Sequence, residues 1–106
     1  MSPSHQIAID VATDERGRKV LVASGDIDLQ TAPVLRRHIE RTAEPGEALV
    51  IDLRQVRFMD SPGLGTIVFC DRSQREQGGH LVLKDATGAV RDLFDVVQLG
   101  KVILLE

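Results

Sequence analysis

The run of residues from Ala48 to Leu53 constrains the fold more than any other segment, because Asp52 is its only polar member. Successive side chains of a strand point to opposite faces of a sheet, so a strand that is apolar at nearly every position leaves no face for solvent. The run therefore predicts a central strand that is covered on both faces, as in sheets with parallel strands. We expect Asp52 to lie near the end of this strand, with a backbone hydrogen bond.

Strand and helix patterns alternate on both sides of this central strand. Ile7, Ile9 and Val11 alternate with other residues and predict a strand with one buried face. Val20 to Ala23 predict a second strand that forms a hairpin with the first. A first helix is expected next, capped by Asp28 or Thr31, with Pro33 in its first turn, its end at Pro45-Gly46, and one face formed by Leu35, His38, Ile39 and Thr42. After the central strand we expect a loop from Gln55 to Asp60, with apolar anchors at Val56, Phe58 and Met59, and then a helix from Ser61 to Gly78-Gly79 that has Leu64, Ile67, Val68 and Asp71 on one face. The chain continues with a predicted strand from His80 to Lys84, a helix capped by Thr87 with Val90, Leu93, Phe94 and Val97 on its inner stripe, and a last strand from Val102 to Leu105.

The resulting order, β-β-α-β-α-β-α-β, predicts an α/β fold with a mixed β-sheet of about five strands and helices packed on it. The 106 residues suit a single domain over residues 1–106. Residues 1–5 are polar and contain Pro3, so we expect them to be disordered. With three Phe and no Trp or Tyr, the core must be aliphatic.

Charge and composition exclude several classes of function. The formal net charge of −3 argues against nucleic acid as a partner, because nucleic-acid-binding domains usually carry a basic face. No apolar run approaches the roughly 20 residues of a membrane-spanning helix, and Met1 to Asp10 do not resemble a signal peptide. One cysteine, Cys70, allows no internal disulfide. We therefore expect a cytoplasmic protein with no membrane insertion.

Ser61 lies at the predicted start of a helix. The residue before a proline is pushed out of the α region, which is the backbone state of an N-cap residue, and Pro62 has the fixed φ of a first helical position. Gly63 and Gly65 each cost up to about 1 kcal/mol relative to alanine inside a helix, which suggests a close approach by a strand, a ligand or a partner chain. On the residues alone, Ser61 is explained as a structural cap and the glycines as packing positions.

The segment from Val56 to Val68, with Asp60-Ser61-Pro62-Gly63-Leu64-Gly65 at its centre, closely resembles the phosphorylation segment of the STAS family, and of bacterial anti-sigma-factor antagonists in particular. Ser24 to Ala32 resemble the family's Gly-acidic-aliphatic-Asp stretch with its downstream Thr, and Val90 to Leu99 resemble its C-terminal helix and the last short strand after it. These matches cover nearly the whole chain in the family's order. One position departs: family members more often carry Ser, Thr or Ala at position 62, and proline lacks an N–H that could meet a phosphate.

The resemblance implies a regulatory binding protein that is not an enzyme and has no cofactor or metal. Members of the family are similar in binding a cognate anti-sigma factor, often a serine kinase, which frees the sigma factor. The kinase phosphorylates the serine after the motif Asp and weakens the complex, and a phosphatase reverses the modification. Carried over to this chain, the phosphorylation site is Ser61, and the partner-binding residues are Asp26, Asp28, Thr31, Asp60, Ser61, Pro62, Gly63, Leu64 and Gly65.

Three alternatives follow from the same residues. The fold also serves, without phosphorylation, as a scaffold subunit of a lipid-transport or stress-sensing complex. Asp26 and Asp28 share a strand face and resemble half of a divalent-ion site, but no third ligand is apparent and the histidines show no ligand spacing. A nucleotide-hydrolysing domain would need a phosphate-binding loop, and the chain has no Gly-x-x-x-x-Gly-Lys-Ser/Thr segment.

Overall fold

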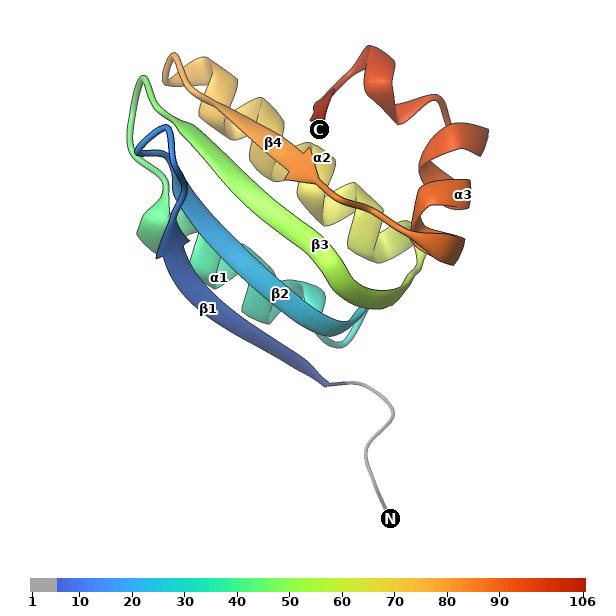
Figure 1. Ribbon diagram of the computed structural model, residues 1–106. Helices are drawn as coiled ribbons and strands as arrows, with labels where there is room; N and C mark the ends of the chain where they lie inside the picture. Colours follow the sequence, from blue (N-terminus) through green and yellow to red (C-terminus); the bar gives the residue numbers. More distant parts are fainter. Residues whose placement is uncertain (1–5) are drawn as a thin grey trace.

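The computed structural model describes residues 6–106, so the expectations for residues 1–5, with His5 among them, lie outside the described residues. Within 6–106 the elements follow the predicted order β-β-α-β-α-β-α-β (Figure 1). The strands are β1 (Ile7–Thr13), β2 (Lys19–Ile27), β3 (Ala48–Met59), β4 (His80–Lys84) and β5 (Leu104–Leu105). The helices are α1 (Ala32–Thr42), α2 (Ser61–Glu76) and α3 (Gly88–Val96), and a short 3-10 turn, η1 (Leu99–Lys101), precedes β5.

The strands form one mixed sheet in the order β1-β2-β3-β4-β5. β1 and β2 are the predicted antiparallel hairpin, and every other neighbouring pair is parallel. The apolar run from Ala48 to Leu53 lies in β3 at the centre of the sheet, as predicted. Figure 1 shows α1 and α2 behind the sheet and α3 beside the end of β4. Because β2 and β3 are parallel, their C-terminal ends lie at the same end of the sheet, next to the start of α2.

The core is mainly aliphatic on both faces of the sheet, and Phe94 is its aromatic side chain. On the face covered by α1 and α2, alternate residues of the central strands are fully buried, among them Leu21, Ile51 and Leu83. On the opposite face Val20, Val50 and Val82 form a second, smaller cluster. Val50 is completely buried. The prediction that the central strand is covered on both faces is thus confirmed at Val50 only, because Ala48 and Asp52 on the same face are half-buried and neither α1 nor α2 covers that face.

The structure corrects several predicted element boundaries. The predicted loop from Gln55 to Asp60 is wrong, because β3 continues through it to Met59. Register shifts between Val22 and Ser24 and between Gly25 and Asp26 let β2 stay paired with this extension. Phe58, predicted as an apolar anchor of that loop, is 48% exposed. Irregular pairing of this kind leaves no period-2 pattern in the sequence, and so the strand was missed.

The last elements are shorter than predicted. β5 covers only Leu104–Leu105, because η1 and a turn take up the residues before it. On α3 the inner stripe of Val90 and Phe94 is buried as predicted, but Val97 lies past the end of the helix and is 47% exposed. Asp52 lies well before the end of β3, and its carboxylate accepts the backbone N–H of Arg54 at 2.9 Å. The backbone hydrogen bond was predicted correctly and the place in the strand was not.

Candidate functional site

Ser61 is the first residue of α2 and is exposed, but it is not the N-cap residue that the sequence predicts. The cap is Asp60, whose backbone is extended (φ −102°, ψ 177°) and whose Oδ1 accepts the N–H of Gly63 at 2.7 Å. Pro62 follows at the second helical position, where its missing N–H leaves no intrahelical bond unmade. Because the carboxylate has taken the capping role, the hydroxyl of Ser61 is not needed to start the helix.

The Asp60 carboxylate also joins two segments that are far apart in the sequence. Its second oxygen, Oδ2, accepts the backbone N–H of Leu29 at 3.2 Å, and its own N–H donates to the carbonyl of Ile27 at 3.2 Å. The end of β2, the turn before α1 and the start of α2 therefore share one hydrogen-bonding residue. Two of the three motif segments found in the sequence meet at this point.

The turn before α1 is held by Asp28 and Thr31. Asp28 Oδ1 accepts the N–H groups of Gln30 and Thr31 at 2.9 and 3.0 Å. The hydroxyl of Thr31 accepts the N–H of Asp28 at 2.9 Å and donates to the carbonyl of Asp26 at 2.8 Å. Both side chains are buried. Thr31 is the N-cap residue of α1, one of the two that the sequence predicts, but its side chain makes no capping hydrogen bond because it is used to fold the turn itself.

Gly63 is required by the close approach of α2 to β2. A Cβ on this residue would lie 2.5 Å from the carbonyl oxygen of Ile27, which is closer than real Cβ contacts come. The close approach predicted for the two glycines is therefore confirmed at Gly63 and wrong at Gly65, where a Cβ would meet open space. Leu64, between them, is half-buried against the main core.

The exposed part of this region contains two apolar side chains whose exposure the sequence does not predict. Leu29 is 69% exposed beside the buried Asp28, and Phe58 is exposed near the end of β3. A shallow cavity of about 210 Å³ adjoins Leu29 between α1 and α2. It is lined by Leu29, Ala32, Pro33, Arg36, Pro62 and Thr66. The sequence signals for this surface are Leu29, an apolar residue within the polar stretch that follows β2, and Phe58, which the sequence predicts as an apolar anchor.

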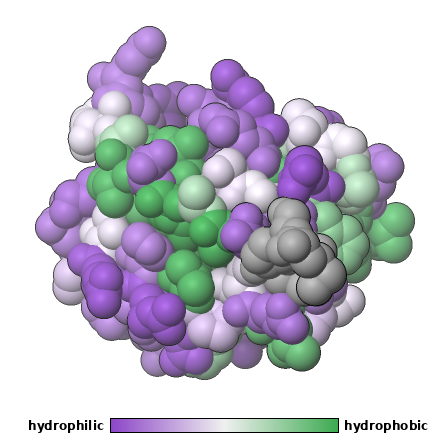
Figure 2. Space-filling view, turned by 90° about the horizontal axis from the view of Figure 1, so that it is seen from below, coloured by the Kyte–Doolittle hydropathy of each residue, from purple (hydrophilic) through white to green (hydrophobic). Residues whose placement is uncertain are grey.

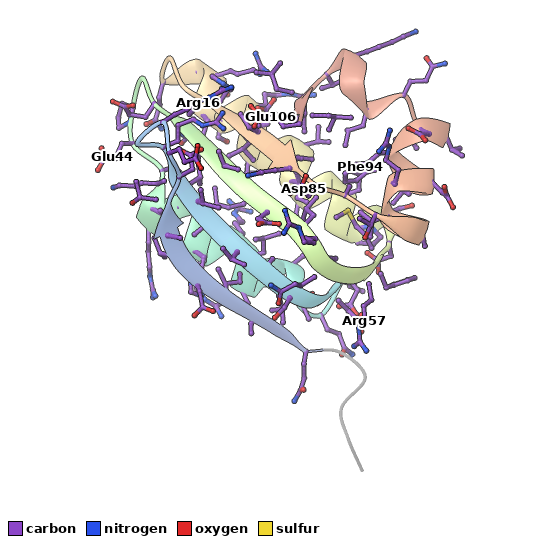
Figure 3. All side chains as sticks on the ribbon, viewed as in Figure 1. Arg16, Glu44, Arg57, Asp85, Phe94 and Glu106 are labelled. Atoms are coloured by element: carbon purple, nitrogen blue, oxygen red, sulfur yellow. The ribbon has the colours of Figure 1, made fainter. Side chains whose placement is uncertain are left out.

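Two arginines, Arg57 and Arg36, lie at the borders of the exposed surface around Ser61. Arg57 is exposed (Figure 3) and lies 3.9 Å from the carboxylate of Asp26. Arg36 stacks over the ring of Phe69, with 4.6 Å between its guanidinium carbon and the ring centroid, and pairs with Glu40 at 3.1 Å. The surface around Ser61 therefore combines exposed apolar groups with charges of both signs, a composition that suits contact with another protein.

The structure lends no support to metal or redox chemistry in the part of the chain that it describes. Asp26, Asp28, His38 and His80 belong to no group of three or more ligand-type side chains suited to a metal ion, as judged over residues 6–106. Burial raises the pKa of the Cys70 thiol to about 11, and that thiol is enclosed within the core. A thiol in this state is protonated at neutral pH and therefore a poor nucleophile.

No helix within residues 6–106 has the length and apolar character needed to cross a membrane.

The family model "Mlab, STAS domain" matches residues 11–106. An anti-sigma-B factor antagonist of Bacillus subtilis (strain 168) is 39% identical over 97 residues, covering 92% of this chain and 88% of that protein. An anti-sigma-B factor antagonist of Listeria monocytogenes is 32% identical over 98 residues, covering 92% and 86%.

A solved structure shows the same architecture. The crystal structure of an anti-sigma factor antagonist from Mycobacterium paratuberculosis superposes with a TM-score of 0.81 at 30% identity, covering 99% of this chain and 89% of that one. The element order, the mixed five-stranded sheet and the family match over most of the chain agree with one another. The chain belongs to the STAS domain family.

Proposed function

We propose that this protein is an anti-sigma-factor antagonist that binds a cognate anti-sigma factor through the surface around Ser61 and loses that binding when Ser61 is phosphorylated. The partner is a serine kinase, a phosphatase reverses the modification, and the protein itself catalyses no reaction and acts in the cytoplasm. The observation that carries the proposal is that Ser61, the first residue of α2, is exposed. It lies next to Asp60, which connects α2 to the turn after β2. Relatives named anti-sigma-factor antagonists, similar over most of their length, support it.

The residues expected at the partner interface divide into two groups by burial. Ser61, Pro62 and Gly65 are exposed and available for contact. Asp28, Thr31 and Gly63 are buried, so we assign them the role of shaping the surface that the partner touches. Asp26, Asp60 and Leu64 are intermediate in exposure and border it. We add Leu29 and Phe58 to the contact surface, because both expose large apolar side chains beside it.

A phosphate on Ser61 would remain at the surface of the protein. The N–H of Gly63 is already bonded to the Asp60 carboxylate, the N–H of Leu64 to the Asp60 carbonyl, and Pro62 has none. Apart from the N–H of Ser61 itself, the donors of the first turn are therefore not available to draw the phosphate back onto the helix. The modification places nearly two negative charges next to Asp60, in the middle of the proposed interface.

The size of the electrostatic effect is sufficient for a switch. The two negative charges of the phosphate and one carboxylate at ~6 Å repel each other by roughly 1–6 kcal/mol for effective dielectric constants between 80 and 20. Each 1.4 kcal/mol of lost binding free energy lowers the affinity about tenfold. Repulsion from an acidic group of the partner would thus release it without any change in the fold.

The experiment uses the cognate kinase-type anti-sigma factor with ATP. Intact-mass measurement is expected to show one added phosphate on the wild-type chain and on Ser73→Ala, a matched control at the other end of α2, and none on Ser61→Ala. By calorimetry, Ser61→Asp is expected to bind the unreacted partner at least about tenfold more weakly than Ser61→Ala. Equal affinities of Ser61→Asp and Ser61→Ala for the partner would contradict the proposed phosphorylation switch. Absence of phosphorylation, with stable co-purification in a transport or stress-sensing complex, would favour a scaffold subunit instead.

A further inference from the structure

β1 forms an unpaired edge of the sheet. It is the first strand in the sheet order, and within residues 6–106 no strand pairs with its outer side. Among its seven residues, Ile7–Thr13, only Asp10 is charged. Natural proteins usually protect an edge of this length with several charges, a proline or a bulge, because an unprotected edge pairs with another chain.

The hydrogen-bonding groups of β1 alternate between its two sides. The carbonyl of Gln6 accepts the N–H of Asp26 at 3.0 Å, so position 6 faces β2. In an antiparallel ladder the next residue faces away and the alternation continues along the strand. The backbone groups of Ile7, Ile9 and Val11 consequently point outward, toward the empty side of β1.

The same three residues form an apolar row. They pair with Gly25, Ala23 and Leu21 of β2, which places their side chains on the helix-covered face. Ile7 and Ile9 are only half-buried and Val11 is 59% exposed. Figure 2 shows apolar surface gathered on the side of the molecule where Figure 1 places β1 and α1. The unpaired backbone edge and the exposed apolar row therefore coincide.

We propose that β1 pairs antiparallel with β1 of a second copy of this chain, about a two-fold axis at Ile9, to give one continuous sheet across the dimer. In this register Ile9 faces Ile9, Ile7 faces Val11, and Asp10 faces Ala8 of the other copy. The outward-pointing N–H and C=O groups of one copy then lie opposite the outward-pointing groups of the other copy, as an antiparallel ladder requires. A register centred on Asp10 would place two carboxylates directly opposite each other, and like charges in that position destabilise a strand pair.

The occupant is a second copy because the strand is complementary to itself. A two-fold interface brings the same patch of both subunits together, so the patch must match its own reversed copy. The row Ile7-Ile9-Val11 is apolar in both directions, and its only charged neighbour, Asp10, is offset from its own image. The pairing uses the outer edge of β1, whereas Ser61 belongs to α2, so it does not depend on the proposed function.

Sedimentation velocity of the full chain over increasing concentration tests the proposal. The wild type is expected to shift from monomer to dimer, and Val11→Lys to raise the dissociation constant about tenfold or more, because it places two charges in the apolar row. Ala12→Lys is the matched control: it lies on the other face of the same strand and should dimerise as the wild type does. Circular dichroism checks that both variants are folded. A wild type that stays monomeric up to high micromolar concentration, or equal weakening by both lysines, would overturn the proposal.

The register is tested by cysteine substitution with oxidised glutathione as the oxidant. Residues that exchange both backbone hydrogen bonds across an antiparallel pair have Cα atoms about 5.5 Å apart, within the range that a disulfide spans. Ile9→Cys should therefore give a covalent dimer on a non-reducing gel, since Ile9 faces its own copy, whereas Val11→Cys, which faces Ile7, should not. The native Cys70 is buried and does not interfere. Cross-linking of Val11→Cys as strong as that of Ile9→Cys would refute the register.

Discussion

The guanidinium of Arg18 and the carboxylate of Glu106 form a two-pronged ion pair, with Nη1–Oε2 and Nη2–Oε1 distances of 2.9 Å each. Arg18 precedes β2 and Glu106 follows β5, so β3 and β4 lie between the strands that the pair connects. Arg16 reaches the same carboxylate at 3.7 Å, and Figure 3 shows it near Glu106. The pair joins β2 to β5 on the face that carries the small cluster of Val20, Val50 and Val82.

This pair predicts acid sensitivity of the fold. The hydrogen bond from Arg18 holds the pKa of Glu106 below its ordinary value of 4.5. Because the folded-state pKa is the lower one, the contribution to stability is present above about pH 4.5 and is lost as the pH falls through the folded pKa. Glu106→Gln should therefore unfold at lower urea concentration than the wild type at neutral pH, and the difference should shrink in acid. Glu76→Gln, at the exposed end of α2, is the control, and a difference that does not change with pH would contradict the prediction.

The contact between α2 and β2 predicts opposite effects for two neighbouring glycines. Gly63→Ala should lower the free energy of unfolding by about 1–3 kcal/mol, because its Cβ would press against the backbone carbonyl of Ile27. Gly65→Ala should be neutral or raise it by up to about 1 kcal/mol, since its Cβ meets open space in a helix. Urea denaturation of both variants measures the difference. Similar effects of the two substitutions would show that the close approach does not limit this position.

The order of elements could be predicted from sequence because most elements have a recognisable hydrophobic pattern. The central run at Ala48 to Leu53 and the inner residues of α2 are examples, and both lie where their patterns predict. The extension of β3 to Met59 could not be predicted in the same way. It depends on irregular pairing with β2, which is a property of two strands together and not of either segment alone.

The start of α2 at Ser61 was predicted correctly, but the residue that caps it was not. Ser61 and Asp60 are both acceptable caps by residue type, and the sequence favoured Ser61 because it precedes Pro62. The structure selects Asp60, because only its carboxylate has two oxygens to bond both Gly63 and Leu29. Leu29 shows the same limit, since its exposure depends on how the turn before α1 folds.

Asp71 predicts a large cost for removing a buried acceptor. Its side chain is 3% exposed, its Oδ1 accepts the N–H of Leu81 at 3.0 Å, and its Oδ2 accepts Nε of Arg75 at 2.8 Å. Asp71→Leu leaves the buried N–H of Leu81 without a partner and should lower the free energy of unfolding by about 1–3 kcal/mol. Asp71→Asn keeps an oxygen acceptor and should cost less. Thermal and urea unfolding compare the two, and an equal loss would mean that the hydrogen bond to β4 is not what stabilises this residue.

Asp60 predicts a local effect that stability alone would not reveal. Asp60→Ala removes the N-cap of α2 and should lower the free energy of unfolding by about 0.5–2 kcal/mol. It also frees the N–H groups of Leu29 and Gly63, whose hydrogen exchange should accelerate more than the change in global stability explains. Asp60→Asn, which keeps an acceptor oxygen, should fall between this variant and the wild type, and Asp92→Ala on the exposed side of α3 should change neither amide. If exchange at Leu29 stays at the wild-type rate in Asp60→Ala, the carboxylate does not hold the two segments together, and the turn after β2 keeps its shape through Asp28 and Thr31 alone.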